Sequence, residues 1–333
     1  MSPLRRAVVV VLAGIGLYVA LPALLEVIGS WPQFVNLAPW WLTVTFLSQV
    51  GSFLCSAALM RLVIPGSTWF ATFAAELAGN AVTNVVPSAG AAGAGLQYRM
   101  LVTSGLEGDR VVGGLTATGV LGVAGVLILP VFALPVVFGG VAVSPGLVHA
   151  AELGVVGFAL VLTFGVVALF TDGLLVGLGR AWQWLLSRVI RRRRVTRDLS
   201  HRLLEQRDLV RSVLGENWWR ATLLVAGHIG LDYMSLLAAL RATGARPNPA
   251  MVLLAYAATG VVALVPITPG GLGIVEASLS GLLVLSSVSS SAAVVATFAY
   301  RLAAYWLPIV GGGALYVLFR RRYGVLESAE RSA

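Results

Sequence analysis

The sequence is poor in charge and contains no lysine. All 23 basic residues are arginine, and 11% of the 333 residues are charged, where a soluble domain carries roughly 25%. This scarcity excludes an ordinary water-soluble domain. The single cysteine, Cys55, excludes a disulfide framework. The three histidines lack the spacing of a metal cluster, so no metal or other cofactor is predicted.

Hydrophobic residues are abundant instead. They make up 58% of the chain, and the mean hydropathy is +0.89. A hydrocarbon core about 30 Å thick is crossed by roughly 20 apolar helical residues. Six segments meet this requirement as full transmembrane helices: 7–28, 39–60, 111–138, 153–170, 218–240 and 292–318. The sequence therefore predicts an all-α polytopic membrane protein in which residues 1–333 form one membrane domain.

The arginines cluster in short polar segments, and their positions predict the orientation. Residues 173–217 contain ten arginines, and Trp182 and Trp184 give this segment the character of an amphipathic helix at the membrane surface. Arginine is enriched on the cytoplasmic side. We therefore predict a multi-pass protein of the cell membrane with this segment, the N-terminus and the tail 320–333 in the cytoplasm. The net charge of +9 is assigned to topology and anionic lipids, so no nucleic-acid partner is predicted.

Two further apolar stretches, 70–105 and 249–287, are interrupted by proline and glycine. Proline lacks the helical N–H, and clustered glycines permit non-helical backbone. Each stretch is therefore predicted to be a helical hairpin. The predicted tip residues are Pro87, Gly90 and Gly93 in the first hairpin and Pro266, Pro269, Gly270, Gly271 and Gly273 in the second.

The arginine clusters also predict how these hairpins enter the membrane. All clusters share one side only if an even number of crossings separates them. A hairpin that enters and leaves on one side meets this condition, and its arms of about 12 to 17 residues are short for a crossing. We predict two re-entrant hairpins, the first in a half formed by 1–172 and the second in a half formed by 218–319. Such a pair, entering from opposite faces, is typical of an inverted-repeat transporter.

Several polar side chains fall inside these apolar segments. The candidate substrate-binding residues are Glu76, Asn80, Asn84, Arg99, His228, Asp232, Glu276 and Arg301. A charged side chain at the bilayer centre costs about 2.5 to 3.5 kcal/mol. The charged members therefore predict ion pairs, with Arg301 opposite Asp232 or Glu276, or contact with a ligand. His228 lies four residues before Asp232, a spacing compatible with proton coupling.

The motifs at the two tips resemble those of a known family. Residues 265–283, VPITPGGLGIVEASLSGLL, resemble the P-x-T/S-P-G-G-L-G-x-x-E signature of the flippase-like membrane domain of lysylphosphatidylglycerol synthases and standalone relatives. Residues 80–100, NAVTNVVPSAGAAGAGLQYRM, are similar to that family's N-x-x-x-P-x-x-x-G-G-x-x-R block, with the paired glycines loosened to Gly90-Ala-Ala-Gly93. The resemblance places Glu276 and Arg99 at the family's acidic and basic positions.

The resemblance implies movement of a lipid between leaflets. The expected function is a flippase for a phospholipid or lipid-linked headgroup, whose partners are membrane lipids with an anionic or isoprenoid phosphate headgroup. No synthase activity is expected, since the chain ends at Ala333, and no nucleophile elbow or phosphate loop indicates another enzyme. Two alternatives are a scaffold or accessory subunit of a lipid- or glycan-processing enzyme and a secondary transporter of a small solute. The sequence is also compatible with a homo-oligomer.

Overall fold

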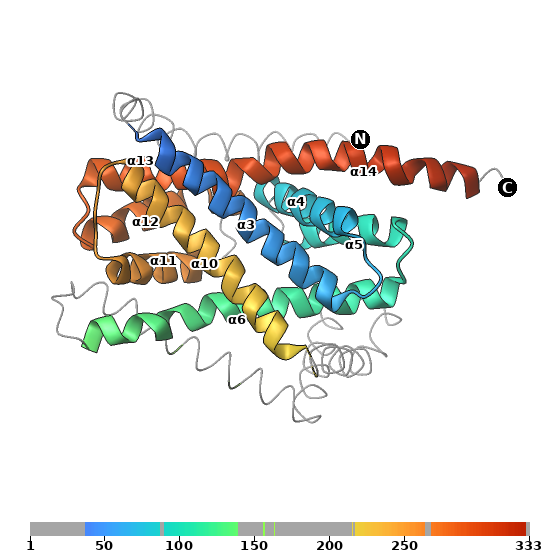
Figure 1. Ribbon diagram of the computed structural model, residues 1–333, viewed down its shortest axis with the longest axis horizontal. Coiled ribbons are helices and arrows are strands. Elements are labelled where there is room, and N and C mark those ends of the chain that lie inside the picture. Colours follow the sequence, from blue (N-terminus) through green and yellow to red (C-terminus); the bar gives the residue numbers. More distant parts are fainter. Residues whose placement is uncertain are drawn as a thin grey trace, which may run out of the picture.

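The computed structural model describes residues 37–86, 90–138, 217–263 and 268–330, together with the single residues 156, 163 and 215. Helices and short connections account for all of these residues, with no strand among them (Figure 1). The all-helical prediction is thus confirmed for this part of the chain. The predicted spans 7–28 and 153–170 and the arginine-rich segment 173–217 lie outside the described residues, apart from single positions.

Four of the predicted spans form helices that are long and apolar enough to cross a membrane. They are α3 (Pro39–Val63), α6 (Gly108–Phe138), α10 (Trp218–Ala242) and the continuous run of α13 (Ser290–Arg301), η2 (Leu302–Trp306) and α14 (Leu307–Glu330). In the last run the apolar helix covers Ser290–Gly324. The length and composition of these helices identify a polytopic membrane protein.

Helices α3 and α10 lie side by side at the centre of the molecule (Figure 1). Pro39 begins α3, where its missing N–H would have no helical partner in any case. The backbone N–H of Ala38 donates to the carbonyl of Ala242 at 3.1 Å, so the start of α3 meets the end of α10. Farther along, the Ser235 hydroxyl donates to the Thr45 carbonyl at 3.0 Å. The two helices are therefore antiparallel and joined by polar contacts along their length.

The first predicted hairpin consists of α4 (Trp69–Val85) and α5 (Ala91–Thr103). The Thr68 hydroxyl caps α4 by accepting from the N–H of Ala71. Gly90, at φ 81°, precedes α5 in the left-handed conformation that glycine adopts at little cost. The break predicted between the two arms is confirmed, while Pro87 lies outside the described residues.

The second predicted hairpin consists of α11 (Pro249–Ala263), the short helix η1 (Pro269–Gly271) and α12 (Ile274–Leu285). Its glycines Gly270, Gly271 and Gly273 all have positive φ, which explains why the tip is rich in glycine. The break is again confirmed, and Pro266 falls in the short part of the loop outside the described residues.

Glycines allow the first hairpin to pack closely, both internally and against the last helix. A Cβ added at Gly93 of α5 would lie 2.4 Å from the carbonyl oxygen of Gly79 on α4. A Cβ at Gly312 of α14 would lie 2.4 Å from the carbonyl oxygen of Leu77, also on α4. Small residues permit this backbone contact between membrane helices. Helix α4 is consequently held between α5 and α14.

The two hairpins lie on opposite sides of the α3–α10 pair in Figure 1, with α4 and α5 on the right and α11 and α12 on the left. Helix α4 packs against α14, and α11 packs against α6. The end of α4 also contacts η1, so the tip of the second hairpin meets the first hairpin inside the molecule. This arrangement places the two broken segments next to each other.

Candidate functional site

An ion pair between Arg301 and Glu276 lies at the tip of the second hairpin. Glu276 sits in the first turn of α12, where its Oε2 accepts from the backbone N–H of Gly273 at 2.7 Å. A carboxylate is favoured there by the unpaired N–H groups of the helix start. Arg301, the last residue of α13, donates from Nε to Glu276 Oε1 at 2.6 Å, and the two side chains are 13% and 8% exposed. The result is a buried, charge-assisted contact between the hairpin and the last helix.

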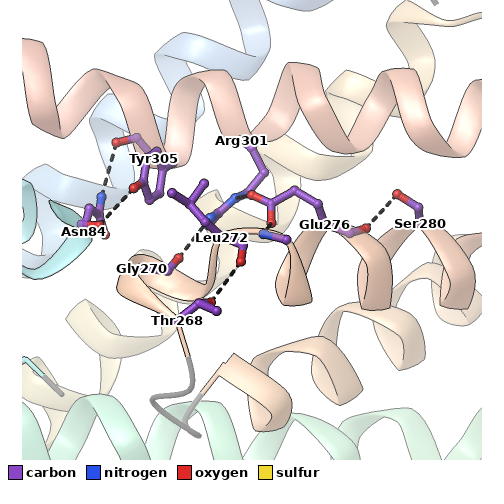
Figure 2. Close-up of polar contacts among 9 residues, drawn as sticks. Asn84, Thr268, Gly270, Leu272, Glu276, Ser280, Arg301 and Tyr305 are labelled. Carbon is purple, nitrogen blue, oxygen red and sulfur yellow. Dashed lines mark hydrogen bonds and ion pairs between the residues drawn. The ribbon is translucent and has the colours of Figure 1, made fainter. Parts of the chain in front are cut away.

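Arg301 also holds the backbone of the tip. Its Nη2 donates to the carbonyl of Gly270 at 2.9 Å, as Figure 2 shows. Gly270 has φ 56°, and a Cβ there would lie 2.9 Å from the backbone of Asn84 and 2.5 Å from the ring of Tyr305. Thr268 closes the loop by donating to the Leu272 carbonyl at 2.9 Å. Glycine at position 270 is therefore required by both conformation and space.

Tyr305 joins this tip to the end of the first hairpin. Its hydroxyl donates to the carbonyl of Asn84 at 2.9 Å, and the Asn84 amide donates back to the carbonyl of Tyr305 at 3.2 Å (Figure 2). The Arg301 guanidinium lies 4.6 Å from the centre of the Tyr305 ring, within the range of a cation–π contact. Tyr305 belongs to the π-helical turn η2, which is followed by Leu307 and then Pro308. Turns of this kind occur often at functional sites.

Glu76 forms a second polar cluster inside the first hairpin. Its Oε1 accepts from the Ser56 hydroxyl of α3 at 2.7 Å and from the Asn80 amide at 3.0 Å. Its Oε2 accepts from the Gln97 amide of α5 at 3.1 Å. Glu76 is buried, and these partners are all uncharged. The cluster therefore connects both arms of the hairpin to α3 through uncharged partners.

Asp232 forms a third cluster in the second half. Its Oδ2 accepts from the hydroxyls of Tyr256 on α11 at 2.5 Å and Tyr300 on α13 at 2.8 Å. The side chain of His228, which lies one helical turn before Asp232, contacts α3 instead, and its Nδ1 lies 2.8 Å from the Ser52 hydroxyl. The predicted neighbours His228 and Asp232 are thus used in different contacts, and no hydrogen bond joins them among the described residues.

The structure brings together part of the predicted site. Arg301, Glu276, Gly270 and Asn84 meet at the tips, and Arg301 pairs with Glu276 rather than with Asp232. Arg99 is exposed on α5, and its side chain forms no hydrogen bond or ion pair with any described residue. The sequence prediction missed Ser56, Gln97, Tyr256, Tyr300 and Tyr305. Of these, only Tyr305 carried a signal, since it follows Arg301 by four residues on the same helical face.

An open cavity of about 760 Å³ lies away from the tips, between the end of α3 and the starts of α4 and α10. Arg61, Trp69 and Arg220 are among the residues that line it. The Arg61 guanidinium lies 4.9 Å from the centre of the Trp69 ring. Arginine beside tryptophan is typical of the boundary between lipid headgroups and hydrocarbon.

The apolar helices, the two broken hairpins and the buried ion pair define a polytopic membrane protein with a polar interior at the hairpin tips. The chain belongs to the family described as the lysylphosphatidylglycerol synthase TM region, whose model matches residues 7–312. This confirms the family resemblance predicted from the two tip motifs. The comparison with curated proteins gave no significant match.

Proposed function

We propose that this protein is a lipid transporter of the cell membrane that moves a phosphate-bearing headgroup between leaflets, without acting as an enzyme. The proposal rests on the number of hydrogen bonds that the Arg301 side chain forms within the protein. Its mostly buried guanidinium donates one N–H to Glu276 and one to Gly270, whereas an arginine side chain has five N–H donors. The remaining donors suit phosphate oxygens, which arginine binds through short charge-assisted hydrogen bonds.

The lengths of the hairpin arms support re-entrant insertion. Helix α11 has 15 residues and α12 has 12. At about 1.5 Å per residue the arms are roughly 22 and 18 Å long, short of a hydrocarbon core about 30 Å thick. Non-helical backbone inside a membrane is tolerated where it is buried in protein or lines a wet cavity. The tip of the second hairpin is half-buried and packs against Arg301, Tyr305 and Asn84, so it is covered by protein in part. We propose that the headgroup passes along a polar groove beside this tip.

Helix packing supports the proposed inverted repeat. In the first half the hairpin helix α4 packs against α14 of the second half, and in the second half α11 packs against α6 of the first half. The equivalent helices α3 and α10 pair with each other at the centre. This reciprocal pattern is expected when two similar halves are related by an axis in the membrane plane.

The arginines of the described residues support the proposed orientation. Arg61 and Arg220 line the large cavity, and Arg320, Arg321 and Arg322 directly precede Tyr323, which contacts Thr68. Arg110 lies at the start of α6, where Gly114 packs against Ile64 at the end of α3. The opposite end of α10 carries Arg241 and is followed by Arg246. Arginine enrichment marks the cytoplasmic side, so the first hairpin opens to the cytoplasm and the second to the outside.

The test compares Arg301→Met with the double variant Arg301→Met/Glu276→Gln in phosphatidylcholine vesicles that contain fluorescent phosphatidylglycerol. Loss of arginine alone strands a buried carboxylate, and breaking such a pair commonly costs about 3 to 5 kcal/mol. The double variant removes that penalty and should recover thermal stability. If Arg301 binds phosphate, the double variant should still move little fluorescent lipid, measured as the fraction protected from a membrane-impermeant quencher.

Full lipid movement by a well-folded double variant would contradict binding of phosphate by Arg301. The matched control is Arg110→Met/Glu107→Gln, which removes an exposed ion pair at the start of α6 with an N–O distance of 3.2 Å. This control should keep both stability and transport, because exposed pairs contribute only about 0 to 1 kcal/mol.

A further inference from the structure

Glu76 is a buried acid that forms no ion pair with any of the residues that the structure describes. Glu76 is 7% exposed and lies in the middle of α4. Its three side-chain partners are the hydroxyl of Ser56 and the amides of Asn80 and Gln97. By contrast, Glu276 has an arginine within 2.6 Å. The buried glutamate of the second hairpin therefore has a charged partner, whereas the partners of the one in the first hairpin are uncharged.

The charged and titratable groups on the described helices around α4 form no ion pair with Glu76. Helices α3, α5 and α14 and the tip η1 pack against α4. In α3, α5, η1 and the part of α14 up to Tyr323, the candidates are Cys55, Arg61, Tyr98, Arg99, Tyr316, Arg320, Arg321, Arg322 and Tyr323, none of which lies in η1. None of them forms an ion pair with Glu76. Arg61 instead donates to the Ser67 carbonyl, and Arg322 stacks over Phe70.

We infer that Glu76 is a proton-binding site, which takes up and releases a proton as the first hairpin changes its contacts. An ionised carboxylate that is buried without a cation is costly, and a bound proton removes that cost. The three hydrogen bonds offset part of the same cost when the proton leaves. Because a hydroxyl and a primary amide can each donate or accept, these partners can bond either form of the acid.

The partners favour a proton over a metal cation. Hard cations are held by several oxygen ligands, whereas two of the three side chains around Glu76 present amide N–H groups to the carboxylate. Gly79 makes room for this arrangement, since a Cβ there would lie 2.5 Å from the Gln97 side chain. Glycine at position 79 thus leaves room for the Gln97 side chain of α5 to contact Glu76 on α4. The hydrogen bond between Gln97 and Glu76 therefore depends on the close packing of the two arms.

The site is connected to the hairpin tips. Glu76, Asn80 and Asn84 follow one another at every fourth residue of α4, and Asn84 bonds Tyr305 beside Arg301. Protonation would weaken the charge-assisted hydrogen bonds from Ser56 and Gln97. The contacts of α4 with α3 and α5 would therefore be less stable. The coupling to lipid movement rests on the proposed function, while proton binding by Glu76 does not.

Infrared titration of the purified full-length protein tests proton binding directly. Between about pH 6 and pH 8, where exposed carboxyl groups stay ionised because their pKa values are about 4, the wild type should show a protonated-carboxyl band that is missing from Glu76→Gln, which keeps the shape of the acid. Glu107→Gln, which changes an exposed acid at the start of α6, should leave the band in place. A wild-type spectrum without such a band in this pH range, or a band that persists in Glu76→Gln, would overturn the inference. A stable Glu76→Asp variant should retain the band.

Vesicles with fluorescent phosphatidylglycerol and an imposed pH gradient test the coupling. The gradient should accelerate lipid movement by the wild type and Glu107→Gln but have no effect on Glu76→Gln. Acceleration of Glu76→Gln by the pH gradient, or of the wild type by a sodium gradient alone, would refute proton coupling through Glu76. If no variant moves this lipid but the infrared band titrates as expected, the proton site stands and the transport proposal fails for this lipid.

Discussion

At the scale of single residues, uncharged hydroxyl groups bind an acid for which the sequence predicted an ion pair. Asp232 is held by the hydroxyls of Tyr256 and Tyr300, which come from two different helices. A tyrosine hydroxyl can donate to a carboxylate while its ring packs among apolar side chains. Asp232 thus joins α10, α11 and α13 without a buried arginine.

Replacing Tyr300 with phenylalanine should destabilise the protein through this contact. The change keeps the ring and removes a donor 2.8 Å from Asp232. A hydrogen bond to a charged group contributes about 1.5 to 3 kcal/mol, and the bond from Tyr256 to Asp232 remains. The melting temperature in detergent should therefore fall for Tyr300→Phe and stay unchanged for Tyr98→Phe, whose side chain is exposed. Equal melting temperatures for both variants would show that Asp232 gains nothing from Tyr300.

The polar residues of the site were predictable, but their partners were not. Four-residue spacing placed Glu76, Asn80 and Asn84 on one helical face, and membrane depth marked Arg301. Choosing between Asp232 and Glu276 as the partner of Arg301 depends on how separate helices pack. Sequence periodicity contains no information on that choice. Serine and tyrosine partners also give no distinctive pattern inside apolar helices.

The hairpins are the elements in which glycine has the clearest structural role. Sequence predicted their breaks because proline and clustered glycine oppose a continuous helix. It did not predict that Gly79 and Gly93 bring the backbones of α4 and α5 into contact. Such a contact depends on the rotation of each arm about its own axis, which follows from tertiary packing.

Alanine at position 93 should therefore separate the arms of the first hairpin. The new Cβ would lie 2.1 Å from Thr83 Oγ1 and 2.4 Å from the carbonyl oxygen of Gly79. Overpacking of this kind costs about 1 to 3 kcal/mol. Gly95→Ala on the same helix has nothing within 4 Å of its new Cβ and serves as the control. Thermal unfolding should show a lower midpoint for Gly93→Ala alone, and unchanged midpoints for both would argue against close packing of the arms.

At the scale of the whole molecule, the proposed topology makes a labelling prediction. In a Cys55→Ser background, a cysteine at Asp109 should react with an impermeant reagent from the cytoplasm and one at Ser291 from the outside. Both positions are exposed, at the starts of α6 and α13. Intact cells and inverted vesicles provide the two sides, and detergent-opened membranes provide the control for reactivity. Labelling of Ser291→Cys only from the cytoplasm would contradict the single crossing that the proposed topology places between Ser291 and the cytoplasmic arginines Arg320, Arg321 and Arg322.

The last transmembrane helix is shared between the two halves. Its first part, α13, packs against α12 and α10, while its second part, α14, packs against α4 with Gly312 on the Leu77 backbone. The π-helical turn η2 lies between these parts and contains Tyr305, directly after Arg301. If one hairpin rocks against the other, as the proposed function requires, we expect this helix to bend at η2, because kinks in helices occur at π-helical turns. Arg301, which is proposed to hold the headgroup, directly precedes this turn, so bending there would move its guanidinium relative to the hairpin tips.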